Sequence, residues 1–317
     1  MNAVHVFFTQ PFQQMAADFP LFFAEVVISG LLAGVMYALV ALGFVLIFKA
    51  SGIFNFAQGV MALFAALTLV GIMERFGLGP VPAIALTVLV MILLAWLIER
   101  LVLRHLVNQE PIILFMATIG LAYFLEGVGD ILWGADVKAL ALGLPRGASP
   151  WAMDNLGLYV EQLELVAAGT AGILVVVLAV FFQKTTVGRA LRAVADDHQA
   201  ALSVGISLHT IWVVVWSAAG IVALVAGIMW GAKSGVQFSL SLIALKALPV
   251  LILGGFTSIA GAIVGGLIIG VGEKIAEIYW GPVIGGAIEN WFAYMLALVF
   301  LLFRPQGLFG EKIIERV

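Results

Sequence analysis

Long apolar segments separated by short polar ones run along most of the chain. Eight of them can be recognised, near residues 22–48, 56–73, 81–98, 112–133, 163–182, 208–231, 243–278 and 286–303. Most come close to the roughly 20 residues that a helix needs to cross a hydrocarbon core about 30 Å thick. Because lipid cannot hydrogen-bond backbone groups and the segments lack the alternation of strands, they are predicted to be helices. We therefore expect an all-α, polytopic transmembrane bundle that forms a single domain over residues 1–317.

The segment at 243–278 is too long for one straight crossing. Pro249 and the Gly254-Gly255 pair interrupt it, and both residue types break helices. We expect a short or re-entrant helix to about residue 254 and a second helix from about residue 259. The total is then eight or nine crossings.

The composition supports the membrane assignment and excludes several functions. Hydrophobic residues make up 63% of the chain and charged residues only 10%, whereas soluble domains carry roughly 25% charged residues. The chain has no cysteine, four scattered histidines and no G-x-x-x-x-G-K-[ST] phosphate loop. We therefore expect neither a metal site, a cofactor nor nucleic-acid binding. We also expect no enzymatic activity, because no convergent catalytic set is visible and the chain lacks a motif for hydrolysing ATP.

The basic residues predict an orientation. If the loops 49–55, 99–110 and 183–207 share one side with the tail 304–317, that side holds nine of the fifteen Lys and Arg residues. They are Lys49, Arg100, Arg104, Lys184, Arg189, Arg192, Arg304, Lys312 and Arg316. The opposite side holds five: Arg75, Lys138, Arg146, Lys233 and Lys274. The richer side is expected to be cytoplasmic, and the N-terminus, which has no Lys or Arg before Lys49, to be external. An external N-terminus and an internal C-terminus favour nine crossings.

The polar segment 183–207 interrupts the apolar pattern most clearly. From Gly188 to Leu202 it predicts an amphipathic helix that ends at Gly205. Its expected apolar face holds Leu191, Val194, Ala195, His198 and Leu202, and its polar face holds Arg189, Arg192, Asp196 and Gln199. Such a helix either lies flat in the membrane interface or inserts into a groove on a soluble partner.

Glycines spaced four apart indicate close contacts between helices. Gly30 and Gly34, and Gly266 and Gly270, are such pairs, which let a neighbouring backbone approach closely. The run from Gly254 to Gly270 is denser than packing requires. It either packs helices or forms a helix break that lines a path.

Three of the charges within the apolar segments, Glu126, Asp130 and Lys246, are candidates for a role inside the membrane. Glu126 and Asp130 share one helix face, where they either line a path and meet a substrate ammonium group or lie near the outer surface in solvent. Lys246 either pairs with one of these carboxylates or attracts a substrate carboxylate. Between the first two helices, Asn55 and Gln58 either cap the second helix or gate the cytoplasmic mouth. The longest external segment, 134–162, is either a docking surface for a soluble protein or only a connection.

Four blocks of sequence resemble one family. Residues 199–206, QAALSVGI, resemble the E-A-A-x-x-x-G loop of ABC importer permeases, with Gln199 where that pattern often has Glu. The wider loop 187–206, VGRALRAVADDHQAALSVGI, resembles the cytoplasmic loop of the permeases of branched-chain amino acid ABC importers, in their LivH-type branch. Residues 30–59, 248–277 and 301–310 are similar to that family's opening helix, its glycine-rich stretch and its closing R-P-Q-G-L-F-G. The chain departs from the family pattern at Thr257, where glycine is usual, and at Glu126, where a neutral residue is expected.

The resemblance implies a translocation subunit in a bacterial inner membrane, surrounded by membrane lipid. Its implied partners are two cytoplasmic ATP-binding subunits, a second related permease chain and a periplasmic binding protein. The segment 183–207 would then be the coupling helix, with contacts from Gly188, Arg189, Arg192, Ala200, Ala201 and Gly205. The candidate path residues are Asn55, Gln58, Glu126, Lys246, Gly254, Gly255, Ser258 and Gly261.

The expected solute is a branched-chain or other hydrophobic amino acid. Urea, short amides and aromatic acids are alternatives. A stand-alone, ion-coupled carrier is the competing class of protein, and it would use the intramembrane charges as coupling groups.

Overall fold

The computed structural model describes residues 3–107, 109–196 and 198–310, and within these ranges the chain is helical apart from loops and two isolated β-bridges. The long helices are α2 (Leu21–Ser51), α3 (Gln58–Phe76), α4 (Pro80–Leu101), α5 (Pro111–Trp133), α7 (Gln162–Lys184), α10 (Leu208–Ser234) and α12 (Ile259–Ile275). The shorter α-helices are α1 (Ala3–Asp18), α6 (Pro150–Leu156), α8 (Thr186–Asp196), α9 (His198–Ser203), α11 (Ile243–Gly254), α13 (Gly281–Ile284) and α14 (Phe292–Phe303). Four further helical turns are η1 (Leu103–Leu106), η2 (Phe238–Leu242), the π-helical η3 (Ala276–Trp280) and η4 (Ile288–Asn290).

Seven helices in the described ranges are long and apolar enough to cross a membrane. The predicted helical membrane protein is therefore confirmed, whereas the predicted count of eight or nine crossings is not. The helices α11 and α14 have 12 residues each, about 18 Å at 1.5 Å per residue, which is shorter than the hydrocarbon core. The break in the seventh segment lies where it was predicted, because α11 ends at Gly254 and α12 begins at Ile259. Helix α1 was not predicted from the sequence.

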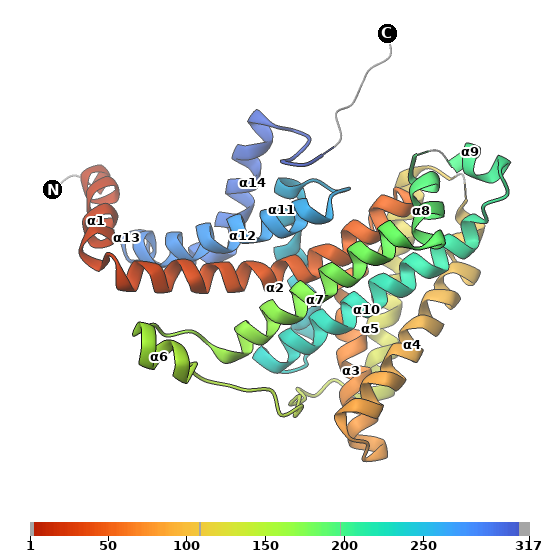
Figure 1. Cartoon of the computed structure of the whole chain (residues 1–317), viewed down its shortest axis with the longest axis horizontal. Coiled ribbons are helices and arrows are strands. Elements are labelled where there is room, and N and C mark those ends of the chain that lie inside the picture. The colour runs from red at the N-terminus through yellow and green to blue at the C-terminus, as the bar shows by residue number, and fades with distance from the viewer. Residues whose placement is uncertain (1–2, 108, 197, 311–317) are drawn as a thin grey trace, which may run out of the picture.

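Helix α2 forms the centre of the molecule, with α12 antiparallel beside it (Figure 1). Most of α2 is buried, whereas α4, α5 and α7 leave most of their apolar surface exposed, as expected of helices that face lipid. Gly30 lies against the backbone of Gly270 and Val271, and Gly34 lies against the backbone of Gly266. The predicted role of these glycine pairs in close helix contact is therefore confirmed.

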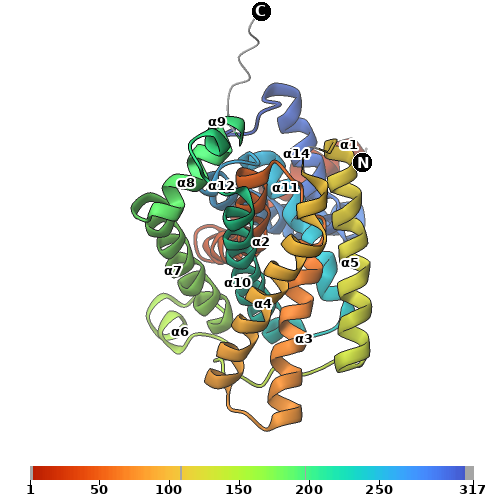
Figure 2. The same cartoon turned by 90° about the vertical axis from the view of Figure 1, so that its right-hand side faces the viewer.

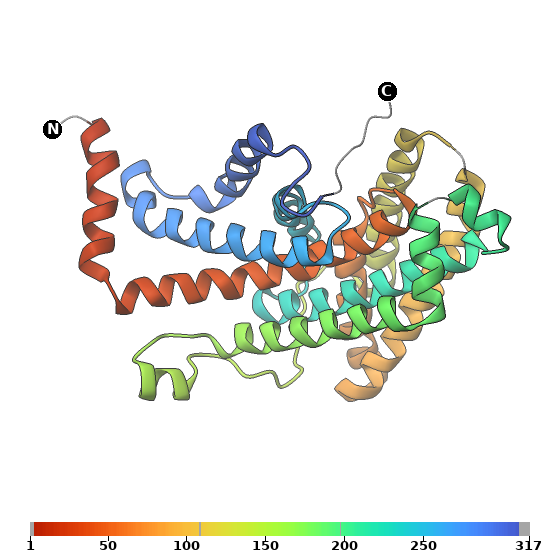
Figure 3. The same cartoon turned by 45° about the horizontal axis from the view of Figure 1, so that its top comes forward.

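The connections between helices gather at two opposite ends of the bundle (Figures 2 and 3). At one end, α8 and α9 lie with the connection from α4 to α5, and His209 Nδ1 at the start of α10 lies 2.6 Å from Glu99 Oε1 at the end of α4. At the other end lie α6 and the turn from α3 to α4, and Lys138 pairs with Glu74. The segments 99–110 and 183–207 thus lie at one end and the turn after α3 at the other, in keeping with the predicted groups, whereas Lys312 and Arg316 of the tail lie outside the described residues. Which end faces the cytoplasm stays a prediction.

Candidate functional site

The amphipathic segment forms two short helices, α8 and α9, instead of the single predicted helix. Leu191 and Val194 are buried on its inner face, whereas Arg189 and Arg192 are exposed. Leu202, expected on the apolar face, is 51% exposed. Gly205 follows α9 with a left-handed backbone (φ 84°), which glycine adopts without strain. The side chains of residues 195–200, and so that of Ala200, lie outside the described part of the structure.

Arg192, Gly188 and Ala201, three residues predicted to contact the ATP-binding subunit, are all engaged within this chain. The Nη1 group of Arg192 donates a hydrogen bond to the carbonyl of Phe182 in the last turn of α7 (2.6 Å). Gly188 is buried against the carbonyls of Phe181 and Phe182, so a side chain there would collide with the end of α7. Ala201 is only 2% exposed. Arg189 is therefore the exposed cation of α8 whose side chain has no partner among the described residues, and it can reach a partner subunit.

Asn55 and Gln58 are fully buried between α2, α3 and α10. The Oδ1 atom of Asn55 accepts a hydrogen bond from the Ala57 amide (3.1 Å), and Gln58 Nε2 donates to the carbonyl of Ala219 in α10 (3.4 Å). Helix α3 begins after Ala57 without a side-chain cap, so the predicted capping role is wrong. The two side chains brace the turn before the helix, and a gating role stays a prediction.

The glycine-rich break between α11 and α12 is a tight joint. Gly254 and Gly261 contact each other through their backbones, and Ser258 caps α12 by accepting a hydrogen bond from the Gly261 amide (3.0 Å). Residues after α14 close this joint, because the amides of Leu308 and Phe309 donate to the carbonyls of Leu253 and Gly254. The closing R-P-Q-G-L-F-G block thus binds the helix break of the glycine-rich block.

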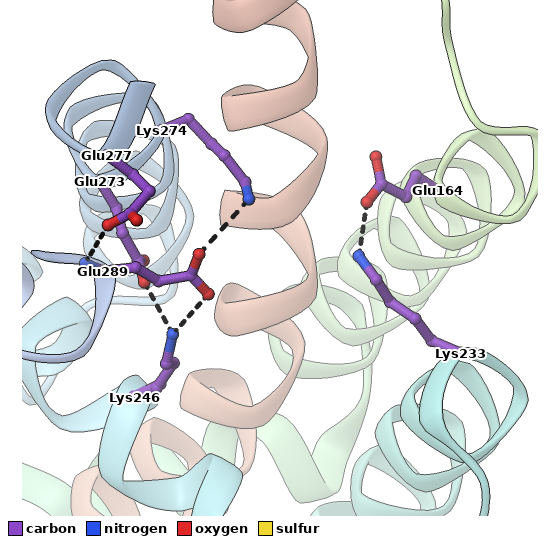
Figure 4. A network of polar contacts seen from close by, with 7 residues as sticks. All are labelled: Glu164, Lys233, Lys246, Glu273, Lys274, Glu277 and Glu289. Carbon is purple, nitrogen blue, oxygen red and sulfur yellow. Dashed lines mark hydrogen bonds and ion pairs between the residues drawn. The ribbon is translucent and has the colours of Figure 1, made fainter. Parts of the chain in front are cut away.

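Lys246 forms an ion pair inside the protein, but not with the predicted partners. Its Nζ lies 2.7 Å from Glu273 Oε1 and 3.1 Å from Glu289 Oε1 (Figure 4). The prediction that Lys246 pairs with Glu126 or Asp130 is wrong, because α11 directs the lysine side chain towards the end of α12 and away from α5. Lys274 also approaches Glu289, at 3.6 Å, and the Glu289 amide donates to Glu277 Oε2 (2.9 Å).

Two opposing effects set the pKa of the Glu289 carboxyl. Burial raises the pKa of the Glu289 carboxyl, but the hydrogen bond from Lys246 and the charge of Lys274 outweigh it and hold the pKa below its ordinary value. Glu289 is therefore a carboxylate at neutral pH. It is half exposed, whereas Glu273 behind it is 2% exposed.

A cavity of about 360 Å³ opens beside this network. It lies between α2, α10, the η2–α11 segment and the end of α12. Its wall combines charged side chains with aromatic and aliphatic ones, namely Ala33, Met36, Tyr37, Trp230, Lys233, Ser239, Leu242, Ile243, Lys246, Lys274 and Glu289. Tyr37 and Trp230 stack with their ring centroids 5.8 Å apart. Lys233 is already neutralised by Glu164, at 2.6 Å.

The other intramembrane acids lie elsewhere. Glu126 lines a separate cavity of about 220 Å³ between α2, α3, α5 and α11, and Asp130 is exposed one turn further along α5. Neither has an ion-pair partner within the described ranges.

Sequence reasoning missed Tyr37, Glu273, Lys274 and Glu289 as members of one site. The signal was present in the Glu273-Lys274 pair, because two adjacent charges closing an apolar helix require partners within the protein or in water. Lys274 was treated only as a loop cation.

The bundle of long apolar helices, with its broken helix and an amphipathic polar segment, is that of a multi-pass helical membrane protein. The family model described as the permease component of the branched-chain amino acid transport system matches residues 26–304. The chain therefore belongs to this family of ABC transport permeases, which are transport proteins and not enzymes.

Individual relatives are similar along nearly the whole chain. The permease protein BraD of high-affinity branched-chain amino acid transport in Pseudomonas aeruginosa is 29% identical, over 93% of this chain and 98% of the relative. The corresponding protein LivH of Escherichia coli K12 is 26% identical, over 94% of this chain and 98% of the relative. A solved structure titled PsaBC from Streptococcus pneumoniae in complex with Fab is 15% identical, with a TM-score of 0.49 over 92% of this chain and 94% of that one. That likeness is too loose to add to the argument.

Proposed function

We propose that this chain is one transmembrane subunit of an ABC importer that moves a hydrophobic amino acid into the cell. The family match over residues 26–304 carries the proposal. Two cytoplasmic ATP-binding subunits supply the energy, a second related permease completes the path, and an external binding protein delivers the solute. The membrane is the bacterial inner membrane, with the α8–α9 end inside.

In this proposal α8 and α9 form the coupling surface. Arg189 is exposed at the end of the bundle that the basic residues mark as cytoplasmic. The apolar face of α8 is buried against this chain through Leu191 and Val194, so its charged face is the one left to contact a soluble subunit. Ala201 is a poor probe of docking, because a bulky residue at this buried position would first disturb the packing of this chain.

The proposed solutes are branched-chain and other hydrophobic amino acids, since the relatives named above are permeases of branched-chain amino acid transport. Urea, short amides and aromatic acids are the competing solutes.

A reconstituted system tests the proposal. The chain is combined in proteoliposomes with its ATP-binding subunits, second permease and binding protein, and uptake of labelled leucine is measured with and without ATP. We expect ATP-dependent uptake by the full assembly and none by this chain alone. Accumulation by the isolated chain driven by an ion gradient would instead establish the competing secondary carrier.

Arg189→Glu tests the coupling surface in the same system. Placing an acid where the partner groove accepts a cation costs several kcal/mol through like-charge contact, so we expect uptake to fall about tenfold or more. Arg75→Glu is the matched control, because Arg75 is also an exposed arginine but lies at the opposite end. Equal uptake in both variants would remove α8 from the coupling surface.

A further inference from the structure

The ion pairs between the start of α11 and the end of α12 include one that a solute can replace. Lys246 contacts two carboxylates, and their surroundings differ. Glu273 is 2% exposed and lies 2.7 Å away, so it is the permanent partner. Glu289 is 38% exposed, lies 3.1 Å away and faces the cavity. A charged solute in the cavity can replace Glu289 at Lys246 without exposing a bare charge in the protein interior.

We propose that this cavity binds a zwitterionic α-amino acid with an apolar side chain by exchanging partners with the Lys246–Glu289–Lys274 ion pairs. The inference rests on the proposed function and gives the transmembrane subunit its own binding site for the solute. The solute carboxylate takes the place of the Glu289 carboxylate between Lys246 and Lys274. The released Glu289 carboxylate then accepts the solute ammonium group.

The balance of charge makes this exchange selective. The bound zwitterion brings one charge of each sign, so the two lysines and Glu289 all keep an opposite charge beside them. An aromatic acid would bring a negative charge only and leave Glu289 displaced without a cation. Urea or a short amide has no charge with which to separate the ion pairs. The site therefore distinguishes among the three solute classes that the sequence left open.

The remaining wall of the cavity suits an aliphatic side chain. Ala33, Met36, Leu242 and Ile243 supply apolar surface next to the charged groups. The volume of about 360 Å³ falls in the range of roughly 300–1,000 Å³ typical of small-molecule sites. Behind the lysine, the buried Glu273 carboxylate keeps its Oε1 atom 2.7 Å from the Lys246 Nζ. This contact does not involve Glu289, so it holds the Lys246 ammonium in place when Glu289 leaves.

Binding to the assembled permease and ATP-binding subunits in lipid nanodiscs, without the binding protein, tests the site directly. Labelled L-leucine is displaced by unlabelled leucine, by N-acetyl-leucine, which lacks the positive charge, and by leucinamide, which lacks the negative charge. In the native complex we expect leucine to compete at least about tenfold better than either analogue, the scale set by one hydrogen bond to a charged group.

Two variants test which residue binds each charged group of the solute. In Glu289→Gln the preference for leucine over N-acetyl-leucine should fall about tenfold, because the carboxylate that binds ammonium and repels anions is gone. In Lys274→Gln the preference for leucine over leucinamide should fall instead. The control is Glu74→Gln, which removes the carboxylate of another ion pair at the same end, outside the cavity.

If the network were merely structural, Glu289→Gln and Lys274→Gln would weaken binding of leucine, N-acetyl-leucine and leucinamide alike, or would leave the preferences among them as in Glu74→Gln. Either result overturns the site. So does the absence of displaceable leucine in the native complex. These failures are distinct from failure of the proposed function, since ATP-driven uptake by the full assembly is measured separately and would persist.

Discussion

Single glycines set the distance between the two central helices. A Cβ on Gly34 would collide with the carbonyl of Gly266, and a Cβ on Gly30 would lie 2.7 Å from the Cα of Val271. Because the obstacles are backbone atoms, no side chain can rotate away to make room. Close backbone contact replaces the hydrophobic effect as the source of helix association in lipid, so these positions should tolerate no larger residue.

We expect Gly34→Val to destabilise the protein by about 3 kcal/mol, at the upper end of the cost of overpacking. Thermal unfolding of the purified chain in detergent, followed by size-exclusion chromatography, measures the change. Gly169→Val is the matched control, because Gly169 also lies inside a helix but has open space around it. Equal melting temperatures for the two variants would show that the contact between α2 and α12 is looser than described.

Residue chemistry also marks the limit of sequence reasoning. That Lys246 requires a partner follows from the cost of an unpaired charge in lipid, and the structure confirms it. Its partner could not be chosen from spacing, because the choice depends on how far α11 turns before the break at Gly254. Asn55 and Gln58 were singled out for their place in the turn between the first two helices, and the contact of Gln58 with α10 is a tertiary feature that this place does not reveal.

At the scale of elements, the residues after α14 pack onto the joint between α11 and α12, and this contact can be tested by substitution. Gly307 has φ 79°, and a Cβ on it would lie 2.8 Å from the Gly255 amide nitrogen. Helix boundaries here were predicted to within a residue, because Gly254-Gly255 ends one helix and Ser258 caps the next. The docking of the C-terminal block onto this joint was not predicted, since nothing in either block specifies the other.

We expect Gly307→Val to destabilise the joint beyond the cost of the left-handed backbone alone. That backbone costs a residue with a Cβ about 1–2 kcal/mol. Gly143→Val shares the penalty, with φ 69°, but has open space around it. The difference between the melting temperatures of the two variants then reports the contact of Gly307 with Gly255 alone. A melting temperature no lower for Gly307→Val than for Gly143→Val would argue against the joint.

At the scale of the whole molecule, the sequence was sufficient for the class of fold and the grouping of loops. Segment length and apolarity decide which helices can cross the membrane, and both are properties of the sequence. The number of crossings is harder, because α11 and α14 are short and their depth depends on tertiary packing. Helix α1 was not predicted, because its residues form neither a long apolar run nor a clear amphipathic pattern.

Orientation follows from the basic residues and can be tested without altering any native thiol, because the chain has no cysteine. Asp154→Cys places a thiol in α6, and Lys184→Cys places one at the opposite end of α7. Both native residues are exposed. The excess of Lys and Arg near Lys184 predicts that this end is cytoplasmic. A membrane-impermeant maleimide should therefore label Asp154→Cys in intact cells, and Lys184→Cys only after permeabilisation. The reverse pattern would turn the molecule over and place α8 and α9 outside, where no ATP-binding subunit could reach them.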